Sequence, residues 1–301
     1  MSPGSDVAGV SRLLRVSRNV ADLARATAFY RDALGFSVRG RATLDGSSWA
    51  RLMELPDARA RATQLQLGAQ ALELVAFDVP GRPYPPDSRS ADLWFQHLAI
   101  VVADMPAAYA RLCRHRFTPI SEGGPQTLPP NTGAVTAFKF LDPDGHPLEL
   151  IQFPAGVGDP CWQQQPGLFL GIDHSALAVG DIARAVDFYG SLGLRVAARS
   201  CNRGMAQQRL DHLPDVRVDV VALQPAQPGP PHIELLGYRE PSGRMLATSA
   251  ANDIAADRLV LETGDLARWA PDVATVPTDG AVCLHDPAGH RLLLVPRRAA
   301  A

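Results

Sequence analysis

A short start motif recurs four times in this chain, and this repeat constrains the fold more than any other feature. In each copy a strand-like apolar run ends in an aspartate, at positions 22, 104, 181 and 265. Seven residues after the first and third of these aspartates comes a Phe-Tyr pair, so the two halves are offset by 159 residues. Such an aspartate predicts a helix N-cap, because its carboxylate accepts hydrogen bonds from free backbone N–H groups.

An end motif also occurs four times, as an alternating strand-like segment. Its third position holds Glu73, Glu149, Glu234 and Leu293. Because β-rich alternating stretches fill the space after each helix, each module is expected to be a strand, a helix and about three further strands. We therefore predict an α+β chain of four modules in two tandem domains, residues 1–154 and 168–301. A linker rich in Gly, Pro and Gln, residues 155–167, separates them.

Four titratable residues of this repeat lie within or at the start of apolar, strand-like runs: His97, Glu149, His174 and Glu234. A charged group in such a run is costly unless it is paired or bound to a metal. A lone histidine that begins a strand is usually structural. Two histidines at matching repeat positions, each with a glutamate at the matching strand end, favour one metal site.

Composition excludes several other classes of function. The chain has 301 residues and a formal net charge of -2, so no basic surplus indicates nucleic acid. No apolar run approaches the roughly 20 residues that span a bilayer. The four cysteines form no CxxC pair, which is typical of reduced thiols in a cytoplasmic protein. We expect a cytoplasmic protein that binds neither nucleic acid nor membrane.

Three stretches resemble the vicinal oxygen chelate superfamily, also called the glyoxalase, bleomycin-resistance and dioxygenase superfamily. They are Val20-Ala-Asp-Leu…Phe29-Tyr-Arg-Asp-Ala-Leu-Gly-Phe36, the two histidine-containing starts, and Asp142-Pro-Asp-Gly-His…Leu148-Glu-Leu. The resemblance covers nearly the whole chain and implies βαβββ modules whose mixed sheets form cups, in two glyoxalase-like domains. It also implies metal ligands on the first and last strands of each module, and a monomer with an internal pseudo-dimer, or a homodimer.

The family uses two ways of pairing its modules. If adjacent modules share a site, the two candidate sets are Arg15/Glu73/His97/Glu149 and His174/Glu234/Arg258/Leu293, each with an arginine at a histidine position. If modules pair across the halves, as in glyoxalase I, the sets are His97/Glu149/His174/Glu234 and Arg15/Glu73/Arg258/Leu293. The cross-half pairing leaves one set complete and concentrates the losses in the other, so we favour it. In the depleted set, Arg15 and Glu73 are expected to form a salt bridge that plugs the outer cavity, and anion binding by Arg15 and Arg258 is the alternative.

Two imidazoles and two carboxylates suit one divalent ion such as Zn, Ni, Co, Mn or Fe. Four ligands on an octahedral ion leave two adjacent positions for a substrate with vicinal oxygens, and the ion can stabilise an enediolate. In glyoxalase I the carboxylate that ends the second module is the general base, which corresponds to Glu149. Asn202 and Gln208, with Gln207, lie in a polar, strand-like stretch and are candidate substrate-binding residues. His232 is an outside candidate ligand.

The resemblance implies a metal-dependent enzyme, an isomerase or lyase of the glyoxalase I type acting on a small oxygenated compound. One alternative is a non-haem iron dioxygenase of the extradiol type that uses two histidines and one glutamate. The other is a binding protein that sequesters a small molecule without catalysis, as bleomycin-resistance members do. Metal content and oxygen consumption discriminate among the three.

Overall fold

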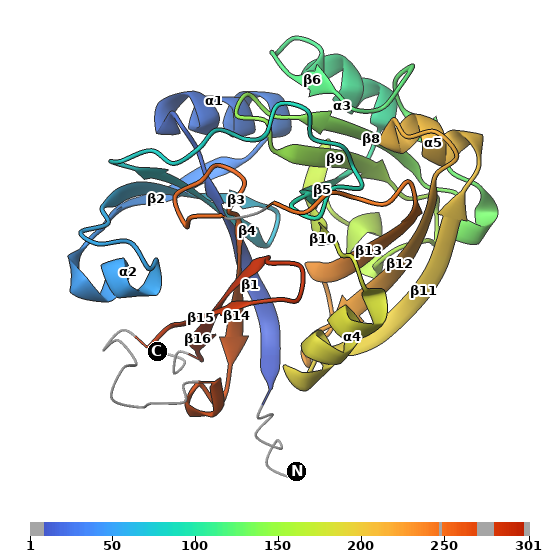
Figure 1. Cartoon of the computed structure of the whole chain (residues 1–301). Helices are drawn as coiled ribbons and strands as arrows, with labels where there is room; N and C mark the ends of the chain where they lie inside the picture. The colour runs from blue at the N-terminus through green and yellow to red at the C-terminus, as the bar shows by residue number, and fades with distance from the viewer. Residues whose placement is uncertain (1–8, 247–248, 270–279, 298–301) are drawn as a thin grey trace, which may run out of the picture.

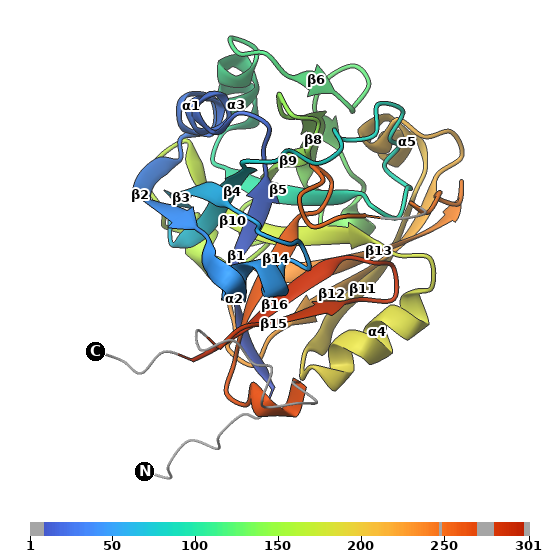
Figure 2. The same cartoon turned by 60° about the vertical axis from the view of Figure 1, so that its left-hand side comes forward.

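Two mixed β-sheets lie side by side and form the body of the protein (Figures 1 and 2). The computed structural model describes residues 9–246, 249–269 and 280–297. One sheet has seven strands in the order β15-β16-β14-β1-β4-β3-β2, and the other has nine, with the path β11-β12-β13-β10-β5-β9-β8-β6 and β7 paired to β8. Each sheet thus combines strands from both halves of the chain, which confirms the cross-half pairing of modules 1 with 4 and 2 with 3.

The elements follow the predicted modules closely. The seven-stranded sheet contains β1 Val10–Asn19, β2 Ser37–Leu44, β3 Ala60–Leu67, β4 Gln70–Phe77, β14 Arg258–Thr263, β15 Val282–His285 and β16 Arg291–Pro296. The nine-stranded sheet contains β5 Gln96–Val102, β6 Thr118–Pro119, β7 Gln126–Thr127, β8 Thr136–Leu141, β9 Pro147–Gln152, β10 Phe169–Ala178, β11 Arg195–Arg203, β12 Arg217–Gln224 and β13 His232–Glu240. The helices are α1 Leu23–Leu34, α2 Gly46–Leu52, α3 Met105–Leu112, α4 Ile182–Ser191 and α5 Met205–Asp211, with short 3-10 helices η1 Pro130–Thr132, η2 Pro160–Gln163 and η3 Ala267–Trp269.

The predicted helix caps are present in the first three modules. Asp22 accepts hydrogen bonds from the backbone of α1, and Asp104 and Asp181 do the same for α3 and α4. Gly35 ends α1 with φ 77°, a left-handed conformation that favours glycine. In module 4 the described residues between Asp265 and position 269 form η3, and residues 270–279 lie outside the described part. None of the helices in the described ranges is long and apolar enough to cross a membrane.

Each sheet is joined at its centre by an antiparallel pair of first strands. β1 pairs with β14 in one sheet, and β10 pairs with β5 in the other. The last strand of a module then lies parallel to its first strand, as β9 does beside β5 and β13 beside β10. Residues on the first and last strands of two modules are therefore brought to the centre of one sheet.

Buried polar links connect the modules within each half. The hydroxyl of Tyr30 on α1 accepts from Arg18 Nη1 at 2.9 Å and donates to Asp142 Oδ2 at 2.8 Å. In the second half the Tyr189 hydroxyl donates to Asp286 Oδ2 at 3.2 Å. The histidines of the repeated Asp-Pro-x-Gly-His turn link that turn to other modules: His146 Nδ1 lies 3.0 Å from Asp142 Oδ2, and its Nε2 lies 3.0 Å from the carbonyl oxygen of Ile254. His146 therefore lies outside the group of candidate metal ligands.

The cup of the seven-stranded sheet is filled by its own side chains. Arg15 Nε lies 3.4 Å from Glu73 Oε1, so the predicted plug is present. The fully buried Arg258 donates to Asn19 Oδ1 and to the carbonyl of Ala251. Apolar side chains complete the filling, namely Met53, Ala58, Ala251, Val260 and Leu293, with Leu14 and Trp49 packed against them.

Candidate metal centre

Four adjacent strands at the centre of the nine-stranded sheet carry the four candidate ligands. In order across the sheet these are Glu234 on β13, His174 on β10, His97 on β5 and Glu149 on β9. On β13, His232 is the register partner of His174. Glu234 lies two residues after His232, so it points to the same face of the sheet as His232 and His174. Ala99 is the partner of Glu149, and His97 lies two residues before Ala99 on β5. The same stagger in both modules directs the four side chains into one cup.

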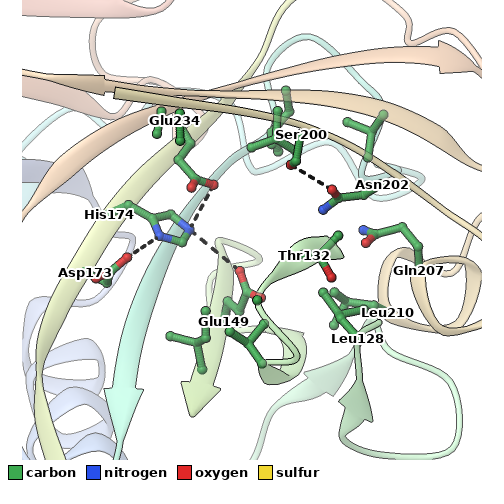
Figure 3. A pocket seen from close by; sticks show the side chains of 18 of the residues that line it. Leu128, Thr132, Glu149, Asp173, His174, Ser200, Asn202, Gln207, Leu210 and Glu234 are labelled. Carbon is green, nitrogen blue, oxygen red and sulfur yellow. Dashed lines mark hydrogen bonds and ion pairs between the residues drawn. The ribbon is translucent and has the colours of Figure 1, made fainter. Parts of the chain in front are cut away.

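The ligating atoms converge on a small volume. His97 Nε2 lies 2.8 Å from Glu149 Oε2 and 3.3 Å from His174 Nε2. His174 Nε2 lies 3.9 Å from Glu149 Oε2 and 3.6 Å from Glu234 Oε2 (Figure 3). Metal bonds of about 2.0–2.2 Å place neighbouring ligand atoms about 3.0–3.5 Å apart, so these separations match a common coordination sphere.

Glu234 lies at the edge of this group. The ligating atoms of His97, Glu149 and His174 all lie within 4.8 Å of one another, and Glu234 is not part of that compact set. Its Oε1 lies 3.5 Å from His232 Nε2, and its side chain is 22% exposed. The position of His232 beside Glu234, rather than at the point where the other three residues meet, makes it a partner of that carboxylate.

A β-bulge in β10 adds Asp173 to the same cup. The register between β10 and β5 shifts between Ile172 and His174, so Asp173 is the extra residue. A bulge re-aims side chains that would otherwise alternate between faces. Asp173 Oδ2 lies 2.9 Å from His174 Nδ1, and its Oδ1 accepts from Trp162 Nε1 at 2.9 Å. The Asp173 carboxylate thereby fixes the imidazole of His174 with Nε2 toward the cup.

The electrostatics of the cup favour a cation at His174. Burial alone would lower the pKa of His174, but the carboxylates of Glu234, Asp173 and Glu149 outweigh burial and raise it to about 9. Burial and the ammonium of Lys139 lower the pKa of His97 to about 4, despite the nearby Glu149. Burial opposes ionisation of Glu149, but its hydrogen bond to His97 and the nearby cations keep the pKa of that carboxyl low. At neutral pH Glu149 and Glu234 are therefore carboxylates and His97 is a neutral imidazole, whereas His174 is a cation with a proton on each ring nitrogen.

A cavity of about 330 Å³ opens beside this centre. In Figure 3 Glu149 and Glu234 approach His174 from two sides, while Asn202, Ser200 and Gln207 lie across the cavity. Of the two candidate substrate-binding residues, Asn202 lines the cavity and Gln208 does not. The polar stretch after Gly204 is the helix α5 rather than a strand, so consecutive side chains are turned by about 100° and Gln207 faces the cavity instead.

Sequence reasoning missed three residues that shape the site. Asp173 precedes His174 directly, and strict strand alternation would have placed it on the opposite face. Lys139 is a charged residue between Phe138 and Phe140 in a strand, the pattern that led to the other candidates. Asp211, at the end of α5, binds Lys139 at 2.7 Å. No sequence pattern indicated that pair.

Comparisons with known proteins agree with this architecture. The sequence profile of the Glyoxalase/Bleomycin resistance protein/Dioxygenase superfamily matches residues 12–150 and 171–294. Glyoxalase I from Zea mays is similar in structure, with a TM-score of 0.59 and 19% identity over 95% of this chain and 92% of that one. A mutant of the same Zea mays enzyme gives a TM-score of 0.62 at 19% identity, covering 95% of this chain and 92% of the mutant chain.

A putative dioxygenase from Bacillus subtilis also shares the fold, with a TM-score of 0.57 and 13% identity over 97% of this chain and 87% of that one. No curated protein matches the chain in sequence. At these identities the solved structures establish the fold, and the sequence profile, which spans both halves, establishes the family. The chain belongs to the Glyoxalase/Bleomycin resistance protein/Dioxygenase superfamily.

Proposed function

We propose that this protein is a metal-dependent enzyme that holds one divalent ion with His97, Glu149, His174 and Glu234. We further propose that it is a glyoxalase I-like isomerase or lyase acting on a small compound with vicinal oxygens. The observation that carries the proposal is the convergence of two imidazoles and two carboxylates from four adjacent strands in one cup.

The donor set fits a divalent ion of the Zn, Ni, Co, Mn or Fe class. Four lone-pair-bearing groups meet with separations of 2.8–3.9 Å, an arrangement that a cation between them stabilises. The raised pKa of His174 shows that the carboxylates around it favour positive charge, because a proton there neutralises part of their negative charge. Once bound, a divalent ion supplies a Lewis acid that stabilises a developing enediolate.

The protein's own residues supply positioning and proton transfer in this proposal. Glu149 is the proposed general base, since its side chain is ionised and lines the cavity where a substrate would bind. Asp173 orients His174. Apolar side chains such as Leu128 and Val220 line the cavity, while Asn202 provides an amide for orienting the substrate.

A non-haem iron dioxygenase is the second candidate, favoured by one observation. The compact set His97, Glu149 and His174 contains two histidines and one carboxylate, the donor set of facial-triad iron sites. The position of Glu234 distinguishes the two candidates: as a fourth ligand it belongs to the isomerase proposal, and as a partner of His232 it belongs to the dioxygenase.

All four cysteines are free, which supports a protein that works in the reducing cytoplasm.

The test begins with protein purified without chelator. Hemithioacetals and small 2-oxo and 2-hydroxy acids are screened for turnover, together with oxygen consumption on catechols. Glu149→Gln should keep some metal but lose about 10²–10⁴-fold in turnover, the usual contribution of a positioned general base. Glu234→Gln should mainly weaken metal binding and recover activity with excess metal. Iron with oxygen uptake would replace the isomerase proposal by the dioxygenase, and a protein without metal or turnover would be a binding protein.

A further inference from the structure

The cavity contains the only lysine of the chain. Among 29 Lys and Arg residues, Lys139 is the single lysine. It lies on β8, where it is the register partner of Glu149 on β9. Its neighbours Phe138 and Phe140 belong to the main apolar core, so strand alternation directs Lys139 to the opposite face, the wall of the cavity. A single compact ammonium therefore lies beside the proposed base.

The Lys139 ammonium is buried but only partly satisfied. Its side chain is 5% exposed, and Nζ donates to Asp211 Oδ1 at 2.7 Å. An ammonium has three N–H donors. Within the described ranges of the chain, Asp211 is the acceptor found for it, so two donors are available on a group that lines the cavity. Burial acts to lower the pKa of Lys139, but Asp211 and Glu149 outweigh burial, so the side chain stays a cation.

Hydrogen bonds other than the ion pair also hold the end of α5, against the segment between β6 and β7. Ser121 Oγ donates to the carbonyl of Leu210 at 2.9 Å, and the backbone N–H of Glu122 donates to the carbonyl of Arg209 at 2.8 Å. The carboxylate of Asp211 has further hydrogen-bond donors, since its Oδ2 accepts from Gln207 Nε2 and from the Tyr238 hydroxyl. Asp211 thus anchors the ammonium in place, and the spare hydrogen-bonding capacity belongs to Lys139.

We propose that Lys139 forms an oxyanion subsite in this cavity, so that the ligand is a small 2-hydroxy or 2-oxo acid. This inference rests on the proposed function, because the 2-oxygen and one carboxylate oxygen of the ligand would bind the metal. The second carboxylate oxygen then accepts a charge-assisted hydrogen bond from Lys139. A neutral compound with vicinal oxygens leaves that ammonium with unused donors in a buried site, which disfavours its binding.

Two bidentate probes separate the subsite from metal chelation. Oxalate chelates through two oxygens and keeps two others, whereas acetohydroxamate has no oxygen left after chelation. Both are titrated calorimetrically into the Zn²⁺-loaded wild type and into Lys139→Met/Asp211→Asn, in which the pair is neutral and no buried charge is left alone. The double variant should bind oxalate about ten- to a hundredfold more weakly, the loss of one hydrogen bond to a charged group. Its affinities for Zn²⁺ and acetohydroxamate should stay within about twofold of the wild-type values.

Acetohydroxamate is the matched control, because it chelates the metal but leaves no oxygen for Lys139. Equal oxalate affinities in the wild type and the double variant would overturn the subsite. So would an equal loss for both probes, because that result assigns Lys139 a structural role.

The single lysine also allows a measurement that does not depend on the metal. Lysine labelled with ¹³C at the ε carbon gives one side-chain resonance from this chain. Oxalate should shift that resonance, and acetohydroxamate should shift it less. If the wild type binds no metal, the proposed metal centre is refuted. The same oxalate titration of the metal-free protein then tests the Lys139 subsite. A shift with oxalate supports it, and an unmoved resonance at millimolar oxalate overturns it.

Discussion

Metal binding should expel the proton that His174 holds in the metal-free protein. The pKa of His174 is about 9, whereas the ordinary value is 6.5. The proton therefore stabilises the metal-free fold fully below pH 6.5, and this contribution is lost as the pH rises through about 9. A metal ion needs the neutral imidazole, so its affinity should rise over the same pH window.

The magnitude follows from the distance between the working pH and that pKa. Each pH unit below the pKa costs about 1.4 kcal/mol, so removing the proton at pH 7 costs about 3 kcal/mol. This is well below the roughly 10–16 kcal/mol that structural zinc sites supply, so the ion still binds. The dissociation constant should fall about tenfold per pH unit between pH 6.5 and 8.5.

Calorimetry in buffers with different ionisation enthalpies measures the proton directly. At pH 7 we expect about one proton released per ion, because the lowered pKa values of His97, Glu149 and Glu234 already keep the imidazole neutral and both carboxylates ionised. His290→Gln is the control, since His290 binds the carbonyl of Ala178 outside the cup and should leave the release unchanged. A pH-independent affinity, or binding without proton release at pH 7, would refute the assignment of His174 as a ligand.

Two further substitutions test the supports of the site. Asp173→Ala should weaken metal binding about 10–100-fold, which is the usual effect of losing the carboxylate that orients a histidine ligand. Asp173→Asn should lose less affinity because it keeps an oxygen. Competition with a chelating dye measures both affinities, and equal metal affinities for the wild type and Asp173→Ala would contradict this role of Asp173. Tyr30→Phe should lower the free energy of unfolding by about 1–3 kcal/mol, because it leaves Arg18 and Asp142 without their shared partner. Tyr189→Phe breaks one hydrogen bond, so it should lower the free energy of unfolding by less, as measured by urea denaturation. A larger loss for Tyr189→Phe than for Tyr30→Phe would show that the Tyr30 bridge is not a main support of the fold.

The repeat in the sequence predicted the four modules, and the family resemblance supplied the two possible pairings between which the arginines decided. Arginines at positions 15 and 258 occupy the places that histidines hold in the other modules, and only cross-half pairing puts both arginines in one cup. The sheet topology has that pairing. Periodicity succeeded here because a strand buried in a sheet tolerates few polar residues, so those that remain stand out.

The features that sequence could not supply depend on local departures from regularity. The bulge before His174 brings Asp173 into the cup, and a period-two pattern has no means of predicting an extra residue. The seven-residue helix α5 was predicted as a strand because its polar residues show little helical periodicity over so short a length. As a result Gln208 was chosen where Gln207 lines the cavity. Lys139 was predictable in principle, because it interrupts an apolar strand in the same way as Glu149.

Metal stoichiometry tests the central claim most directly. Protein purified without chelator is analysed for bound metals as the wild type, as His97→Ala/His174→Ala, and as Glu73→Gln in the filled cup. One ion per chain is expected in the wild type and in Glu73→Gln, and none in the double histidine variant. Two tightly bound ions per chain, or one ion that remains after both histidines are removed, would contradict a single centre built by modules 2 and 3.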